Sequence, residues 1–120
     1  FGTAEIENAI NAAGLVVESA VVGYPHEVKG QGIYAYVVCE QLPGDTEAAA
    51  AEVMAAVVQG IGKIAKPEKI QFVSGLPKTR SGKIMRRILR KVAEGAADQL
   101  GDTSTLLNPQ IVDEIVAGAL

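Results

Sequence analysis

The sequence predicts a small α+β domain in which a sheet of at least three strands packs with helices. Apolar residues alternate between helical spacing and β-branched runs, in the order helix, strand, strand, helix, strand, helix. The 120 residues are 48% hydrophobic with only two Phe and three Tyr, so we expect the aliphatic core of one ordinary domain. No repeat or long linker divides the chain.

The first helix and the first two strands are predicted within residues 3–40. Thr3 has the side chain of a helix cap, and Gly14 ends the helix. The buried side of this helix is predicted from residues at helical spacing: Ile6, Ala9, Ile10 and Ala13. Runs of β-branched residues at 16–24 and 33–40 then predict two strands joined by an eight-residue loop.

A second helix is predicted to begin at Asp45 or at the threonine after it. Its apolar residues recur at helical spacing: Val53, Val57, Ile61 and Ile64. Two glycines weaken its end and Pro67 prevents its continuation, so residues 69–74 form a short third strand. Asn108 and the proline after it have the pattern of the cap and first residue of a last helix, which continues to about residue 117.

The most informative stretch is Pro-Lys-Thr-Arg-Ser-Gly-Lys at residues 77–83. The proline restricts Leu76 to an extended conformation, and Ser81 and Gly82 can turn the chain into a helix near Lys83. The basic helix that follows is expected to bury Ile84, Ile88, Leu89 and Val92, to expose Arg86, Arg87, Arg90 and Lys91, and to end at Gly95. A lysine at the start of a helix suits an anionic ligand such as phosphate or carboxylate.

Charge is distributed unevenly along the chain. The net charge is −3, yet seven of the eleven Lys and Arg residues fall between positions 78 and 91. This pattern favours a small anion held at one place, and nucleic acid is not expected as a partner. A nucleotide-binding P-loop is excluded because six residues separate Gly75 from Gly82, and Ile84 instead of a hydroxyl residue follows Lys83.

The remaining composition predicts a cytoplasmic protein. No apolar run approaches the roughly 20 residues that cross a membrane and no leader is recognised, so no membrane partner is expected. Cys39 is the single cysteine, which fits a reducing compartment, and its place in an apolar strand predicts a small buried hydrophobe. His26 has no nucleophile or acid at a recognisable spacing, so we expect it to make a hydrogen bond within its loop.

Four stretches of the chain carry a resemblance to a known family. The most specific is LPKTRSGKIMRRILRKVAEG at residues 76–95. It is supported by GTAEIE at 2–7, VVGYPHEVKGQGIYAYV at 21–37 and LGDTSTL at 100–106. In the same order, these stretches resemble the C-terminal part of the AMP-forming acetyl-CoA synthetases, which belong to the adenylate-forming (ANL) superfamily.

The resemblance implies an acetate–CoA ligase that joins acetate to ATP, giving acetyl-adenylate and pyrophosphate, and then passes the acetyl group to coenzyme A, with Mg²⁺ as cofactor. Residues 1–100 would be its mobile C-terminal lid domain and residues 101–120 a tail with a short helix. The partner of the lid is its own N-terminal adenylating domain, which holds most of the ATP and acetate contacts. The chain begins just beyond the interdomain hinge of the family, so we expect a fragment that is inactive by itself.

Lys83 matches the family's lysine that enters the active site during adenylation, so the resemblance implies a catalytic role for it. A cation between the acetate carboxylate and the α-phosphate offsets their repulsion. Related enzymes are acetylated at this lysine, which implies a lysine acetyltransferase and a deacetylase as further partners. Acetylation of Lys83 would remove the charge that adenylation needs.

Two family features are less well matched. The family's basic coenzyme A residue falls on Val58, beside Gln59, so either Lys63 or Lys66 replaces it or this lid contacts coenzyme A less tightly, and we assign no coenzyme A residue. The family's magnesium ligands correspond to the main-chain carbonyls of Asn11, Ala13 and Val16, and carbonyl ligation does not depend on the side chains present.

Two other interpretations stay open. The acid could be propionate or another short-chain acid, because the acyl pocket lies in the N-terminal domain of the family. The chain could instead be a non-catalytic module that binds anions or nucleic acid through its basic helix in a salt-sensitive way. Without the resemblance, a lysine in a solvated basic loop is the ordinary interpretation of Lys83.

Overall fold

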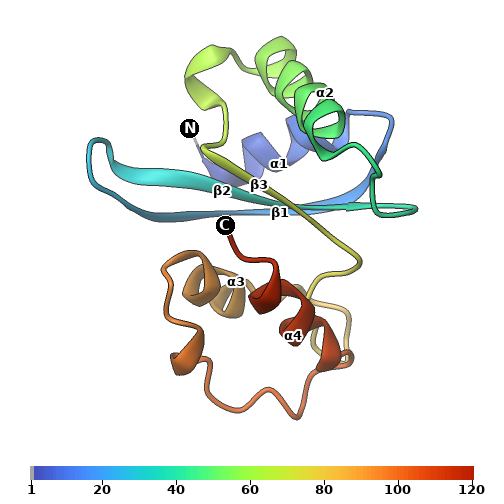
Figure 1. The fold of residues 1–120 in the computed structure, drawn as a ribbon, viewed down its shortest axis with the longest axis vertical. Helices are drawn as coiled ribbons and strands as arrows, with labels where there is room; N and C mark the ends of the chain where they lie inside the picture. Colours follow the sequence, from blue (N-terminus) through green and yellow to red (C-terminus); the bar gives the residue numbers. More distant parts are fainter. Residues whose placement is uncertain (1) are drawn as a thin grey trace.

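The computed structural model describes residues 2–120, which form a three-stranded sheet with helices on both faces (Figure 1). In chain order the elements are α1 (Thr3–Asn11), β1 (Val16–His26), β2 (Gly30–Cys39), α2 (Thr46–Gly60), the 3₁₀ helix η1 (Lys63–Ala65), β3 (Lys69–Val73), α3 (Arg86–Ala93), the 3₁₀ helix η2 (Ala97–Gln99) and α4 (Gln110–Ala117). β2 lies in the centre, antiparallel to β1 and parallel to β3. The predicted α+β class with at least three strands is confirmed.

The sheet separates two hydrophobic clusters. Neighbouring strand residues point to opposite faces, so Val21 and Val37 join the cluster under α1 and α2, whereas Val22 and Tyr36 join the cluster with α3 and α4. Figure 1 shows these helix pairs above and below the sheet. Residues 106–115 contribute to the α3–α4 cluster, and the predicted boundary between residues 100 and 101 stays a prediction.

The β1–β2 hairpin is longer than predicted. Its strands pair as far as His26 and Gly30, so residues 27–29 connect them instead of the predicted eight residues. The His26 Nδ1 accepts hydrogen bonds from the amides of Val28 and Lys29, each at 3.2 Å, and Gly30 has a φ of +80°. These contacts close the turn and confirm the loop hydrogen bond predicted for His26. Pro25 is accommodated because β1 is an edge strand.

The predicted ends of the last two helices are confirmed, because α3 ends at Ala93 just before Gly95 and α4 ends at Ala117, whereas the predicted helix starts are only partly right. Asp45 caps α2, as predicted, and accepts a hydrogen bond at 3.0 Å from the amide three residues later. Thr3 lies inside α1, whose N-cap is the preceding glycine. Ile64 was placed on the apolar side of the second helix but is 78% exposed, because Gly62, with a φ of +136°, redirects the chain. None of the helices within residues 2–120 has the length and apolarity that crossing a membrane requires.

Candidate functional site

The predicted motif lies in a short two-stranded ribbon made of residues 76–85, which is here called the Lys83 loop. Leu76 holds one side in place because its side chain is fully buried in the α3–α4 cluster. Lys78 and Ile84 pair across the ribbon as an isolated antiparallel bridge. The ribbon is therefore a miniature hairpin rooted in the core on the α3–α4 side of the sheet.

Helix α3 begins at Arg86, three residues later than predicted. The amide of Met85 donates a hydrogen bond to the carbonyl of Pro77 at 2.8 Å, which keeps the residues before α3 in the ribbon. Main-chain groups that pair across the ribbon cannot also begin a helix. Lys83 consequently lies near the turn of a hairpin, and not at a helix N-terminus.

Thr79 fixes the main chain of Lys83 from both sides. Its amide donates to the Lys83 carbonyl at 2.8 Å, and its Oγ1 accepts from the Lys83 amide at 3.1 Å. The Thr79 carbonyl accepts from the amide of Gly82 at 2.8 Å, and Gly82 has a φ of +90°, which glycine adopts without strain. The turn therefore has a defined shape.

The Lys83 side chain is exposed beyond this fixed turn. Within residues 2–120, its amine takes part in neither a hydrogen bond nor an ion pair. It borders an open hollow with Ile84, Met85 and Arg90. Because the main chain of Lys83 is fixed and its amine is unpaired among the described residues, the side chain can present a positive charge to an anion outside the domain.

Two neighbouring cations are instead engaged by glutamates. The Lys78 Nζ lies 3.0 Å from the carboxylate of Glu18 on β1. Arg86 was predicted to face solvent, but it forms a two-pronged ion pair with Glu7 on α1, in which one of the bonds is 2.9 Å long. Glu7 also accepts from the Val21 amide at 2.8 Å. Spacing could not reveal these pairs, because the partners lie 60 and 79 residues apart in the sequence.

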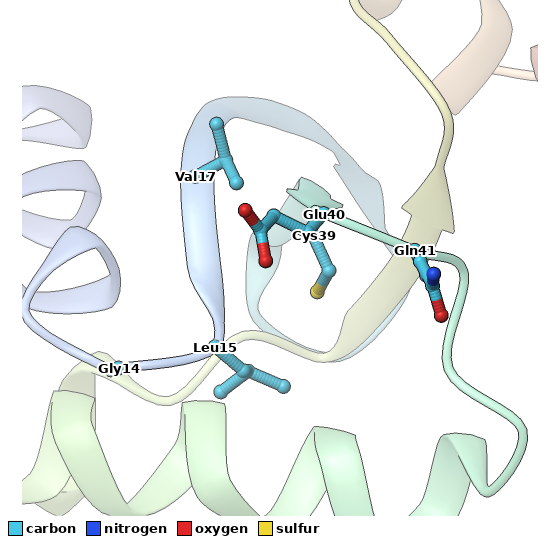
Figure 2. Close-up of a pocket in the computed structure, with 6 residues that line it drawn as sticks. All are labelled: Gly14, Leu15, Val17, Cys39, Glu40 and Gln41. Atoms are coloured by element: carbon cyan, nitrogen blue, oxygen red, sulfur yellow. The ribbon is translucent and has the colours of Figure 1, made fainter.

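Cys39 offers no nucleophile. Figure 2 shows it in a hollow between the α1–β1 turn and the end of β2, beside Glu40. The thiol is half-buried, not buried as predicted. Partial burial, and then the negative charge of Glu52, raise the pKa of the Cys39 thiol above its ordinary value. No histidine lines the hollow, so the thiol stays neutral and unactivated.

Comparison with known proteins then establishes the family. Residues 5–83 match the sequence model of the AMP-binding enzyme C-terminal domain. The chain belongs to this family. Acetyl-coenzyme A synthetases from Mesorhizobium japonicum and Xanthomonas campestris pv. campestris are 58% and 57% identical to it, over 98% and 97% of the chain. The chain spans 18% of the length of each of these curated relatives.

Solved structures support the same assignment. A crystal structure of an acyl-CoA synthetase from Brucella canis matches 76% of this chain and 17% of its own, with a TM-score of 0.70 and 36% identity. A benzoate CoA ligase from Burkholderia xenovorans matches 73% of this chain and 18% of its own, with a TM-score of 0.65 and 35% identity. The resemblance to the AMP-forming acetyl-CoA synthetases is confirmed.

Magnesium was predicted at the α1–β1 turn of this AMP-binding C-terminal domain, on the main-chain carbonyls of Asn11, Ala13 and Val16. The Ala13 carbonyl accepts a hydrogen bond from the Val16 amide at 3.1 Å, which leaves it a second lone pair. Neutral oxygens of this kind, completed by water, fit a hard cation. Residues 2–120 contain no group of three or more His, Cys, Asp and Glu side chains that could hold a metal ion. The carbonyl site stays a prediction.

The positions considered for coenzyme A lie on the other side of the domain. Val58 and Gln59 are on α2, which covers the sheet face opposite α3 (Figure 1). Lys63 and Lys66 follow α2 and are exposed. The AMP-binding C-terminal domain therefore presents Lys83 on one side and these lysines on the other, and which residues contact coenzyme A stays a prediction.

Proposed function

We propose that this chain is the C-terminal lid of an AMP-forming acetate–CoA ligase in which Lys83 serves the adenylation step. The observation that carries the proposal is the exposed Lys83 amine, which projects from a turn with a fixed main chain. Relatives named acetyl-coenzyme A synthetase, 57–58% identical over 97–98% of the chain, support acetate as the acid. Propionate is the alternative, since the relatives' acyl pocket is expected outside the region that this chain matches.

The chemistry explains why a lysine is needed. A carboxylate oxygen of acetate attacks the α-phosphorus of ATP, the P–O bond to the β-phosphate breaks, and pyrophosphate leaves. Two anions must approach each other, so the Lys83 ammonium placed between their oxygens stabilises the transition state by electrostatic attraction. The flexible stem of lysine lets a compact charge reach a cleft of the N-terminal domain.

Thioester formation follows from the resulting acetyl-adenylate. The thiol of coenzyme A attacks the acyl carbon, the bond to the phosphate oxygen breaks, and AMP leaves. Lys83 and the lysines near η1 lie on opposite sides of the sheet, which supports a rotation of the lid between the two steps. Mg²⁺ on the carbonyls of Asn11, Ala13 and Val16 would tie α1 to β1.

The test uses the complete enzyme with Lys83→Ala. Adenylation, measured as acetate-dependent exchange of pyrophosphate into ATP, should fall by a factor of about 10² to 10³ or more. Thioester synthesis from supplied acetyl-adenylate should change little. Lys83→Arg should also lower adenylation because the guanidinium is broad and planar.

The matched control is Arg80→Ala, which removes an exposed cation from the same loop. This variant should leave the ratio of the adenylation rate to the thioester-synthesis rate unchanged. An equal loss of both half-reactions in Lys83→Ala would show that the lysine has no specific role in adenylation.

We also propose that acetylation of Lys83 regulates the enzyme, because the amine is exposed and carries the charge that adenylation needs. Incubation with a lysine acetyltransferase should place an acetyl group on Lys83, detected by mass spectrometry, and should suppress adenylation alone. A deacetylase should restore it. Modification confined to other lysines would refute this proposal.

A further inference from the structure

Asn108 ties the Lys83 loop to the segment before α4. Its Nδ2 donates a hydrogen bond to the Leu76 carbonyl at 2.8 Å, and its Oδ1 accepts from the Lys78 amide at 3.1 Å. The neighbouring amide of Leu107 donates to the Lys78 carbonyl at 2.9 Å. Residues 107 and 108 therefore pair with one edge of the segment 76–78, whose other edge pairs with residues 84 and 85 of the same ribbon.

A carboxamide is suited to this position because it offers one donor side and one acceptor side, as a peptide unit does. Asn108 bonds the residues on either side of Pro77, which has no N–H of its own. Its predicted role as the cap of the last helix is wrong. The N-cap of α4 is Pro109, and it is the Asn108 carbonyl, not the side chain, that accepts the Ile111 amide at 3.0 Å. The side chain serves the loop instead.

We infer that Asn108 is a positioning residue for Lys83, an inference that rests on the function proposed above. The Lys83 amine must reach a cleft in another domain, so the direction in which the ribbon leaves the core decides where the amine arrives. Leu76 and Asn108 set that direction at the base of the ribbon. Asn108 lies outside residues 77–83 of the motif and outside residues 5–83, which match the family model.

The inference predicts a loss of reaction rate in one half-reaction. In the complete enzyme, Asn108→Ala should lower kcat of adenylation about tenfold or more, since a displacement of about 1 Å can lower a rate about 10²-fold. The KM values for ATP and acetate should change little, because the substrates bind elsewhere. Thioester synthesis from supplied acetyl-adenylate should also change little, because Lys83 is not used there.

Two further variants separate positioning from loosening of the fold. Val112→Ala removes buried apolar volume from α4, in the cluster that also holds Leu76, but it keeps the Asn108 side chain, so it should lower the thermal midpoint and leave the ratio of the adenylation rate to the thioester-synthesis rate unchanged. Asn108→Asp keeps an acceptor for the Lys78 amide but loses the donor to the Leu76 carbonyl, so, like Asn108→Ala, it should lower the rate of adenylation relative to that of thioester synthesis. It replaces Asn108→Ala if that variant does not fold.

The outcomes are distinguishable. If Lys83→Ala suppresses adenylation selectively but the folded Asn108 variant keeps the wild-type ratio, the inference fails and the proposed function stands. The inference also fails if Val112→Ala shifts the ratio as far as Asn108→Ala does. If Lys83→Ala lowers both half-reactions equally, the proposed function fails and the role of Asn108 fails with it.

Discussion

Glu7→Ala is expected to destabilise the domain more than removal of its ion-pair partner does. Glu7 joins three elements, because its carboxylate accepts from the Val21 amide on β1 and from the guanidinium of Arg86 at the start of α3. Val21 is buried, and β1 is an edge strand with no further strand to pair its outer amides. Without Glu7, the Val21 amide has no strand partner and little access to water.

The magnitude follows from these two contacts. A buried amide left unpaired costs about 1–3 kcal/mol. The ion pair contributes about 1 kcal/mol or less, because the Arg86 side chain is 38% exposed and water hydrates its charge. We therefore expect a loss of about 2–3 kcal/mol for Glu7→Ala and about 1 kcal/mol for Arg86→Ala. Glu7→Gln keeps an acceptor for Val21 and should also lose about 1 kcal/mol.

The assay is urea denaturation of the 120-residue chain and its variants, with free energies of unfolding from linear extrapolation. The double variant Glu7→Ala/Arg86→Ala should show a coupling energy of about 1 kcal/mol or less. If Arg86→Ala or Glu7→Gln proves as destabilising as Glu7→Ala, the ion pair and not the Val21 amide dominates, and the reasoning is refuted.

Two further predictions concern the Lys83 loop and the tyrosines. Thr79→Val removes the acceptor for the Lys83 amide at similar volume, so it should slow adenylation several-fold, about the effect of one hydrogen bond. Thr79→Ser keeps the hydroxyl and should restore the rate. Equal adenylation rates in the two variants would contradict the role of the hydroxyl. Burial, and then the charge of Tyr34, raise the pKa of Tyr36, so its contribution to stability is complete below the unfolded pKa of about 10 and is lost as pH rises beyond it. Tyr36→Phe should lose about 1 kcal/mol at neutral pH, because the Tyr36 hydroxyl donates to the Leu89 carbonyl at 2.9 Å. Its deficit in urea denaturation should shrink above pH 10, and a deficit independent of pH would contradict this reasoning.

Two predictions from local chemistry were accurate, although the predicted caps at Thr3 and Asn108 were not. Asp45 capped its helix and His26 closed its turn, because both contacts reach only two or three residues along the chain. The start of α3 was misplaced because Lys83 lies in a stretch that pairs across the ribbon with residues 77–79. Propensity favours a helix after Gly82, and pairing across the ribbon overrides it.

For the candidate site, too, local motifs were informative and long-range contacts were not predicted. The motif singled out Lys83 through its resemblance to the family, and the role of Lys83 in adenylation stays a prediction. No pattern indicated that Glu7 would pair with Arg86 or that Asn108 would hold the residues around Pro77. These contacts join α1 to the start of α3, and the segment before α4 to residues 76 and 78 of the Lys83 loop.

The sequence by itself determined the order of helices and strands and the family, and it singled out Lys83 as a candidate, because apolar periodicity and short motifs depend only on residues that are close together in the sequence. The tertiary structure alone decided how that lysine is held. Besides the local contacts with Thr79, the contacts around the Lys83 loop join residues 30 to 79 positions apart, and only the stacking of helices on both faces of the sheet brings those groups within hydrogen-bonding distance. The spacing of residues along the sequence does not predict such long-range contacts.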